Sequence, residues 1–210
     1  AYGGEVIAVT VGDETSKEAL KHALAMGCNE AILISDPAIG NPDSQAIARV
    51  LAAAIQKIGD VELAIFGRQA IDDDLGVTAS QTARVLGWPA LTLVSVISKL
   101  DPEAGIIQVG RSTEEGRQVV ESKLPATLSV VKDICEPRYP SFMGIRKASR
   151  ATIPTWSLHD LGISKLDSTV AHVEFENLPP REIVTEIIEG DSPEQIAETL
   201  ADKIMAEKVL

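Results

Sequence analysis

The most informative part of the sequence is Leu63–Asp74. It reads Leu-Ala-Ile-Phe over Leu63–Phe66 and Gly-Arg-Gln-Ala-Ile-Asp-Asp-Asp over Gly67–Asp74. Its four apolar residues predict a short buried strand, and Val77–Leu86 predicts a helix. A glycine-led turn between a strand and a helix is where α/β proteins hold ligands, because N–H groups at the helix start point into the crevice. We therefore expect an α/β protein with a polar ligand site at this turn.

Strand and helix patterns also alternate before this stretch. Glu5–Val11 predicts a strand, Thr15–Glu18 has the pattern of a capping box that starts a helix, and Ala31–Ile34 predicts the next strand. A helix between Asp43 and Gly59 should bury a face made of Ile47, Val50, Leu51, Ala54 and Ile55. Three such units in a row favour a parallel sheet with covering helices.

The second half of the chain contains different patterns. Further strands that extend or flank the sheet are expected at Leu91–Ile97, Ile106–Arg111, Gln118–Lys123 and Ala126–Val131. The second and third of these should form a hairpin. In Lys132–Ser157 the apolar residues follow neither the helical nor the strand spacing, and the segment contains three prolines. These features predict a long ordered loop.

The C-terminal part is expected to be an arm and a helix. Leu158–Pro180 has an extended pattern, and Ser192-Pro193 has the residue types that start a helix. The buried face of that helix should consist of Ile196, Leu200 and Ile204. We therefore expect an α/β domain over residues 1–157 and an arm with a helix over residues 158–210.

Composition limits the classes of partner. The chain has 210 residues, of which 45% are hydrophobic, so it can bury a sizeable core. Its net charge of -12 argues against nucleic acid and anionic membrane surfaces as partners. No apolar run approaches the length of about 18 residues that a membrane span needs. Cys28 and Cys135 lie far apart and indicate reduced thiols, which is typical of a cytoplasmic protein.

The acidic turn has two interpretations. In the first it is a nucleotide pocket, where Gly67 allows a tight bend, Ala70 leaves room for a flat base, and the N–H groups of Gly76, Val77 and Thr78 take a phosphate. The three aspartates would then point away from the phosphate. In the second they simply cap the helix and favour its positive end. Spacing alone leaves both open.

The segment Lys132–Arg150 is the second candidate site. It holds five cations against two acids, a local charge of +3, with Phe142, Met143 and Ile145 in its middle. An apolar tip flanked by cations suits docking to another protein. The alternative is a solvated basic loop whose Phe142 packs under its own domain.

Other chemistry is not indicated. His22, His159 and His172 have no His, Cys or acid at metal-ligand spacing. No Walker A loop, Gly-x-Gly-x-x-Gly pattern or Ser/His/Asp arrangement is present. We expect neither a metal site nor catalytic residues.

Several motifs together resemble the electron transfer flavoprotein beta subunit. Gly67–Asp74 resembles its signature, and Ala23–Gly27 resembles the motif after its first helix. Lys123–Ala126, Glu136–Tyr139 and Ile145–Ala148 look like its later motifs in the same order. The resemblance covers nearly the whole chain.

The resemblance implies a fold, cofactors and partners. The fold would be a parallel-sheet, three-layer adenine-nucleotide-binding domain of the alpha-hydrolase-like type, with an arm that wraps an alpha subunit. The alpha subunit would carry most of the FAD, and the beta subunit would bury a structural AMP. The heterodimer would carry electrons from flavoprotein dehydrogenases to a quinone oxidoreductase, in the cytoplasm or, in a eukaryote, the mitochondrial matrix. This family begins with a further strand that we expect to be missing here.

The resemblance also assigns residues by position. The AMP site would consist of Val11, Gly67, Arg68, Gln69, Ala70, Ile71, Asp72, Asp73, Asp74, Leu75, Gly76, Val77 and Thr78. The partner-recognition segment would consist of Arg138, Tyr139, Phe142, Ile145, Arg146 and Lys147, with Phe142 as its anchor where the family commonly has leucine.

Two alternatives remain. Electron-bifurcating relatives hold a second FAD in place of AMP and typically read Asp-Gly-Asp-Thr in this region. Asp73 stands here in place of that glycine, which favours AMP. The other alternative is a free-standing nucleotide-binding regulator of the stress-protein type.

Overall fold

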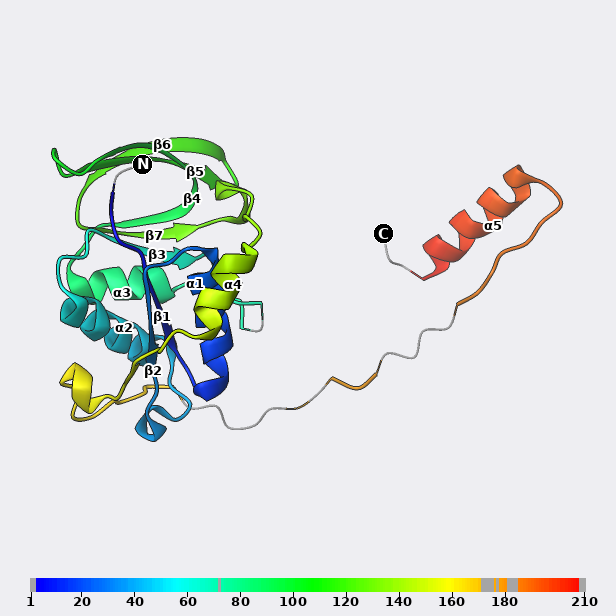
Figure 1. Cartoon of the computed structure of the whole chain (residues 1–210). Helices are drawn as coiled ribbons and strands as arrows, with labels where there is room; N and C mark the ends of the chain where they lie inside the picture. The colour runs from blue at the N-terminus through cyan, green and yellow to red at the C-terminus, as the bar shows by residue number, and fades with distance from the viewer. Residues whose placement is uncertain (1–2, 72, 171–175, 177, 181–184, 208–210) are drawn as a thin grey trace. The chain divides into compact units, whose positions relative to one another are not determined.

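The structure, a computed structural model, describes residues 3–71, 73–170, 176, 178–180 and 185–207 (Figure 1). The chain divides into two compact units, Ala1–His172 and Val173–Leu210. All strands found among the described residues lie in the first unit, and helix α5 (Pro193–Ala206) lies in the second. Among the described residues, none of the helices has both the length and the apolar composition that crossing a membrane requires.

Two sheets form the first unit. One has the order β1-β2-β8 and is parallel, with strands β1 (Ile7–Val11), β2 (Glu30–Ile34) and β8 (Thr155–Trp156). The other has the order β3-β7-β4-β5-β6, with strands β3 (Leu63–Gly67), β7 (Ala126–Val130), β4 (Ala90–Asp101), β5 (Ile106–Thr113) and β6 (Gly116–Lys123). Its first three strands are parallel, and β4-β5-β6 is antiparallel. The predicted β5–β6 hairpin is confirmed.

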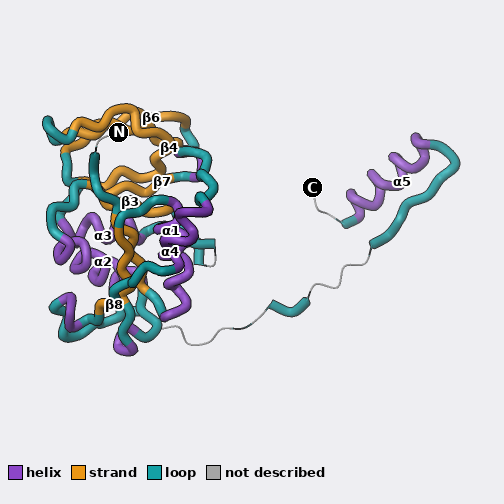
Figure 2. Tube along the Cα trace, viewed as in Figure 1, coloured by secondary structure: helices purple, strands orange, loops and turns teal. Residues whose placement is uncertain are grey.

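Helices cover the strands on two sides. The described residues of this unit form four longer helices, α1 (Lys17–Met26), α2 (Ser44–Ile58), α3 (Thr78–Leu86) and α4 (Phe142–Ser149). Helices α1 and α4 lie side by side on one side, and α2 and α3 lie on the other (Figures 1 and 2). The short 3-10 helices are η1 (Glu14–Ser16), η2 (Pro37–Ile39), η3 (Lys132–Ile134) and η4 (His159–Leu161). The α/β prediction with a parallel sheet, covering helices and a C-terminal helix is confirmed.

Successive residues of β2 show why both faces are covered. Leu33 and Ile34 are fully buried, and neighbours on a strand point to opposite faces. Leu33 packs with Leu20 of α1, whereas Ile34 packs with Val50 of α2. A strand buried on both faces is apolar throughout, which explains the continuous run that the sequence shows.

One local prediction is wrong and another is confirmed only in part. The Thr15–Glu18 capping box does not form, because Thr15 lies within η1 and donates from its N–H and its hydroxyl to Asp13, which caps that short helix. A charged acceptor two residues earlier competes successfully for these donors. On α2, Val50 and Ala54 of the predicted face are fully buried, and its other three residues are half-buried. The other buried positions are Ala46, Ala48 and Ala52, whose small side chains allow close packing.

Two later segments have different outcomes, since the predicted loop is wrong and the predicted C-terminal helix is confirmed. Lys132–Ser157 is not a loop throughout, since it contains η3, α4 and β8. On α5, the predicted N-cap Ser192 accepts a hydrogen bond from the Gln195 N–H, 3.3 Å away, as expected. The predicted buried face is largely exposed, however, with Leu200 at 47% and Ile204 at 38% of full exposure. Ile196 is half-buried, so the described residues cover only the start of this face.

Candidate functional site

The predicted nucleotide loop connects two elements of the first unit. Gly67 is the last residue of β3, and Thr78 is the first residue of α3. The described residues between them are mostly exposed, and Ile71 is fully so. A β-carbon on Gly67 would meet no atom within 4 Å, so the strand end is open to a ligand. Asp72 lies outside the described residues.

Asp73 and Asp74 do not cap α3. The Gln69 amide donates to the carboxylate of Asp74, and the Leu75 N–H donates to Asp73 over 3.4 Å. The N-cap residue of α3 is Val77, which makes no side-chain capping bond. The helix-capping interpretation is therefore wrong for Asp73 and Asp74.

The start of α3 has the chemistry of an anion site. The first N–H groups of a helix lack partners within it, and they carry a partial positive charge. Gly76, with φ of 62°, turns the chain into this helix, and no side-chain oxygen at the N-cap occupies the free donors. The open strand end and these donors are compatible with the phosphate of an adenine nucleotide.

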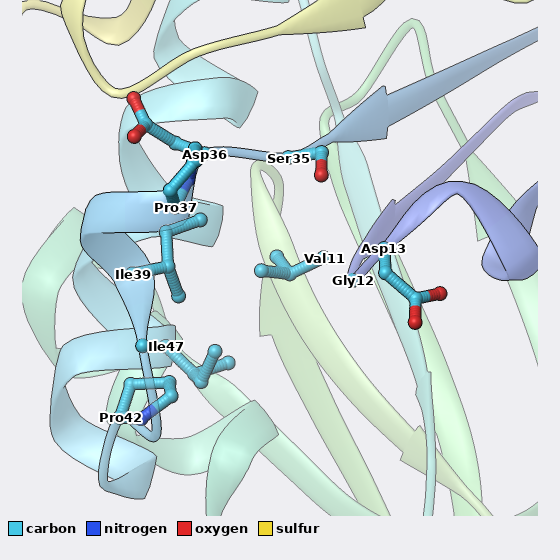
Figure 3. A pocket seen from close by; sticks show the side chains of 10 residues that line it. Val11, Gly12, Asp13, Ser35, Asp36, Pro37, Ile39, Pro42 and Ile47 are labelled. Atoms are coloured by element: carbon cyan, nitrogen blue, oxygen red, sulfur yellow. The ribbon is translucent and has the colours of Figure 1, made fainter.

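Val11 lies at a cavity of about 430 Å³ at the carboxyl ends of β1 and β2 (Figure 3). Its side chain points towards Ile39 and Ile47, and Pro42 closes the same wall. The described residues of the Gly67–Thr78 loop do not line this cavity. The structure therefore places Val11 and the loop at the ends of strands in two different sheets.

The two carboxylates of this cavity already have partners. Asp13 accepts hydrogen bonds from Thr15, chiefly from its hydroxyl, and these lower the pKa of Asp13. Asp36 accepts from the N–H groups of Ala38 and Leu158, at 2.9 and 3.0 Å. Both carboxylates point away from the apolar side chains (Figure 3). The cavity suits an apolar or flat group, and its lining offers no cation to a phosphate. Asp13 and Asp36 were not predicted as site residues, although each precedes a short helix in the sequence.

The predicted docking segment is a helix with exposed apolar side chains. Phe142, the first residue of α4, is 80% exposed, and Tyr139 just before it is 96% exposed. Met143 and Ile145 are exposed as well. The alternative in which Phe142 packs under its own domain is therefore wrong.

Two contacts hold this segment against α1. Arg138 donates from Nη2 to the carbonyl oxygen of Met26, 2.9 Å away. Gly144 approaches α1 so closely that a β-carbon there would lie 2.5 Å from the Ala25 carbonyl oxygen. Ser141 caps α4 by accepting from the Gly144 N–H over 3.0 Å. Neither the Arg138 contact nor the close approach of Gly144 was foreseen, because both depend on residues more than a hundred positions away.

The described residues contain no group of three or more His, Cys, Asp or Glu side chains that could hold a metal ion. The candidate sites are thus a loop with free backbone donors and an exposed apolar helix with cations.

Comparison with known proteins identifies the family. Residues 1–161 match the family described as "Electron transfer flavoprotein domain". The chain is 34% identical, over 96% of its length, to the electron transfer flavoprotein subunit beta of Mycobacterium leprae, of which it covers 77%. The chain belongs to the electron transfer flavoprotein beta-subunit family.

Other members of this electron transfer flavoprotein family have similar coverage. The subunit beta of Thermoanaerobacterium thermosaccharolyticum is 32% identical over 99% of this chain and 80% of the relative. The caffeyl-CoA reductase-Etf complex subunit CarD of Acetobacterium woodii is 36% identical over 99% of this chain and 80% of the relative. The similarity thus extends beyond residue 161 into the second unit.

Proposed function

We propose that this beta subunit, with an FAD-carrying alpha subunit, carries electrons from flavoprotein dehydrogenases to a quinone oxidoreductase. Family membership supports an electron carrier subunit over a free-standing regulator. The exposed apolar side chains of α4, with Phe142 at its start, support docking to a dehydrogenase. An exposed group of large apolar side chains is typical of a surface that binds another protein. The FAD supplies the electron-accepting chemistry when bound, and this chain binds and positions.

We propose that the loop Gly67–Thr78, together with Val11, holds an AMP as a structural ligand. The N–H groups at the start of α3 would take the phosphate, and Ala70 would leave room for the base. The engagement of Asp74 by Gln69 supports this arrangement, since it gives that carboxylate a partner other than the start of α3. No group in this loop is needed as an acid, base or nucleophile.

The docking surface for the dehydrogenase would consist of Arg138, Tyr139, Phe142, Ile145, Arg146 and Lys147. Phe142 would fill an apolar recess of the partner, and the cations would steer the encounter. In the second unit, the exposed face of α5 with Leu200 and Ile204 would pack on the alpha subunit.

A second candidate is an electron-bifurcating beta subunit that holds a second FAD in place of AMP. The 36% identity to CarD, whose name places it in a complex with caffeyl-CoA reductase, favours it. Asp73 at the position where bifurcating relatives typically have glycine favours AMP. We therefore retain the AMP-holding carrier as the first candidate.

Co-expression with an FAD-carrying alpha subunit tests the proposal. We expect a heterodimer whose flavin is reduced by an acyl-CoA dehydrogenase with its substrate. Phe142→Ala should lower kcat/KM for this transfer by about 30-fold, which corresponds to about 2 kcal/mol for a central apolar anchor, while the nucleotide content stays unchanged. No transfer in the wild-type heterodimer, or equal transfer in the variant, would contradict the docking assignment.

A further inference from the structure

A second cavity, of about 380 Å³, lies between the C-terminal end of α1 and α4. We call it the α1–α4 pocket. Arg138, Tyr139 and Lys147 line it from the α4 side, and Met26 and Asn29 line it from the α1 side. No Asp or Glu is among the described residues that line it, although the chain carries a net charge of -12. The lining therefore combines two cations with no anion.

Both cations lack a carboxylate partner in the described part of the chain. No ion pair within 4 Å involves Arg138 or Lys147 there, whereas Lys17 and Lys21 each pair with a glutamate on the same helical segment. The hydrogen bond from Arg138 to Met26 uses one of the five N–H donors of a guanidinium. The pocket therefore keeps donors and positive charge for a ligand.

The end of α1 does not cancel this charge. The N–H groups of Gly27 and Cys28 donate to the carbonyl oxygens of Leu24 and Ala23, each over 3.1 Å, and Arg138 occupies that of Met26. A helix C-terminus carries about half a negative charge, and much less when its carbonyls are bonded. The two full positive charges of Arg138 and Lys147 exceed this partial negative charge, so the pocket attracts an anion.

We propose that the α1–α4 pocket receives a carboxylate side chain of the flavoprotein that docks on Phe142. The inference rests on the proposed function, because it needs a protein partner at α4. Tyr139, which is 96% exposed, belongs to both the pocket and the apolar surface, so one partner can contact both. A partner with an acid beside an apolar recess would gain charge-assisted hydrogen bonds from Lys147 and Arg138. A free anion would gain nothing from Phe142.

Zero-length crosslinking tests the contact directly. The heterodimer is mixed with an acyl-CoA dehydrogenase and treated with a carbodiimide, which joins a lysine amine only to a carboxylate that touches it. We expect peptide mapping to find Lys147 joined to an Asp or Glu of the dehydrogenase. Crosslinks from other lysines but not from Lys147 would overturn the proposal.

Transfer kinetics separate this proposal from the proposed function. Lys147→Gln should raise the apparent KM for the dehydrogenase about 5- to 10-fold, and Lys147→Arg should largely restore it. Arg150→Gln is the matched control, because it removes the same charge from the end of α4 but does not line the pocket. If Phe142→Ala has no effect, the docking proposal fails. If Phe142→Ala weakens transfer but Lys147→Gln acts no more strongly than Arg150→Gln, only the pocket proposal fails.

Discussion

Arg138 donates from Nη2 to the carbonyl oxygen of Met26, a contact of 2.9 Å between residues 112 positions apart. It ties the segment before α4 to the C-terminal end of α1, beside the close approach of Gly144 to Ala25. The exposed side chain of Phe142 is therefore carried by a helix packed on the fold. A docking element that is ordered before binding loses less conformational entropy when the partner arrives.

Gly144→Ala should destabilise this arrangement. The new β-carbon would lie 2.5 Å from the Ala25 carbonyl oxygen, so α4 must move away from α1. Forcing extra volume into a packed contact typically costs about 1–3 kcal/mol, which chemical denaturation would detect as a lower free energy of unfolding. Gly4→Ala is the control, since a β-carbon there meets no atom within 4 Å. Equal stability of the two variants would show that the close contact does not restrain α4.

The same contacts explain why α4 could not be predicted. Pro137, Pro140 and Gly144 are residues that favour loops, and a helix of eight residues has little stability of its own. Its order comes from α1, through contacts that no local pattern reveals. The three β-α units were predictable because their burial repeats locally, as Leu33 and Ile34 of β2 show.

The predictability of the candidate site was also uneven. The loop after β3 was visible because glycine and acids follow an apolar strand. The engagement of Asp74 by Gln69 was not visible, because it depends on the folded path of the loop. The α1–α4 pocket was not predicted, since its two walls come from distant segments.

Ala70→Trp should expel the nucleotide. A large ring at this position would occupy the space assigned to the base, and a packed site accommodates extra volume poorly. We expect the purified heterodimer to contain far less than stoichiometric AMP while it retains its FAD. Val119→Trp, on exposed β6, is a control for the effect of an added ring. A normal AMP content in Ala70→Trp would place the base elsewhere.

Leu200→Asp should weaken assembly with the alpha subunit. Leu200 is 47% exposed on the apolar face of α5, and a charge there would be desolvated in an interface. The dissociation constant of the heterodimer should rise at least about tenfold in a titration of the two subunits. Met205→Asp makes a similar change on the other side of α5 and should have a smaller effect. If both variants weaken assembly equally, the face is not the one that packs.

Asp43→Asn should lower stability in a pH-dependent way. Asp43 accepts from the Ala46 N–H over 2.8 Å and from the Thr169 N–H over 2.6 Å, and these bonds hold the pKa of its carboxyl well below its ordinary value near 3.8. A lowered pKa contributes stability above the unfolded value, and that contribution is lost as the pH falls below it. The Tm of the variant should therefore lie below that of the wild type at pH 7, and the difference should shrink below about pH 4. A difference in Tm that stays constant between pH 3 and pH 7 would rule out this role.

We propose above all that the chain is an electron carrier subunit that holds AMP as a structural ligand. The most direct test is to extract the nucleotides from the purified heterodimer and to quantify FAD and AMP per mole of protein. We expect one FAD and one AMP per heterodimer. Two FAD and no AMP would contradict it and assign the chain to the electron-bifurcating members of the family.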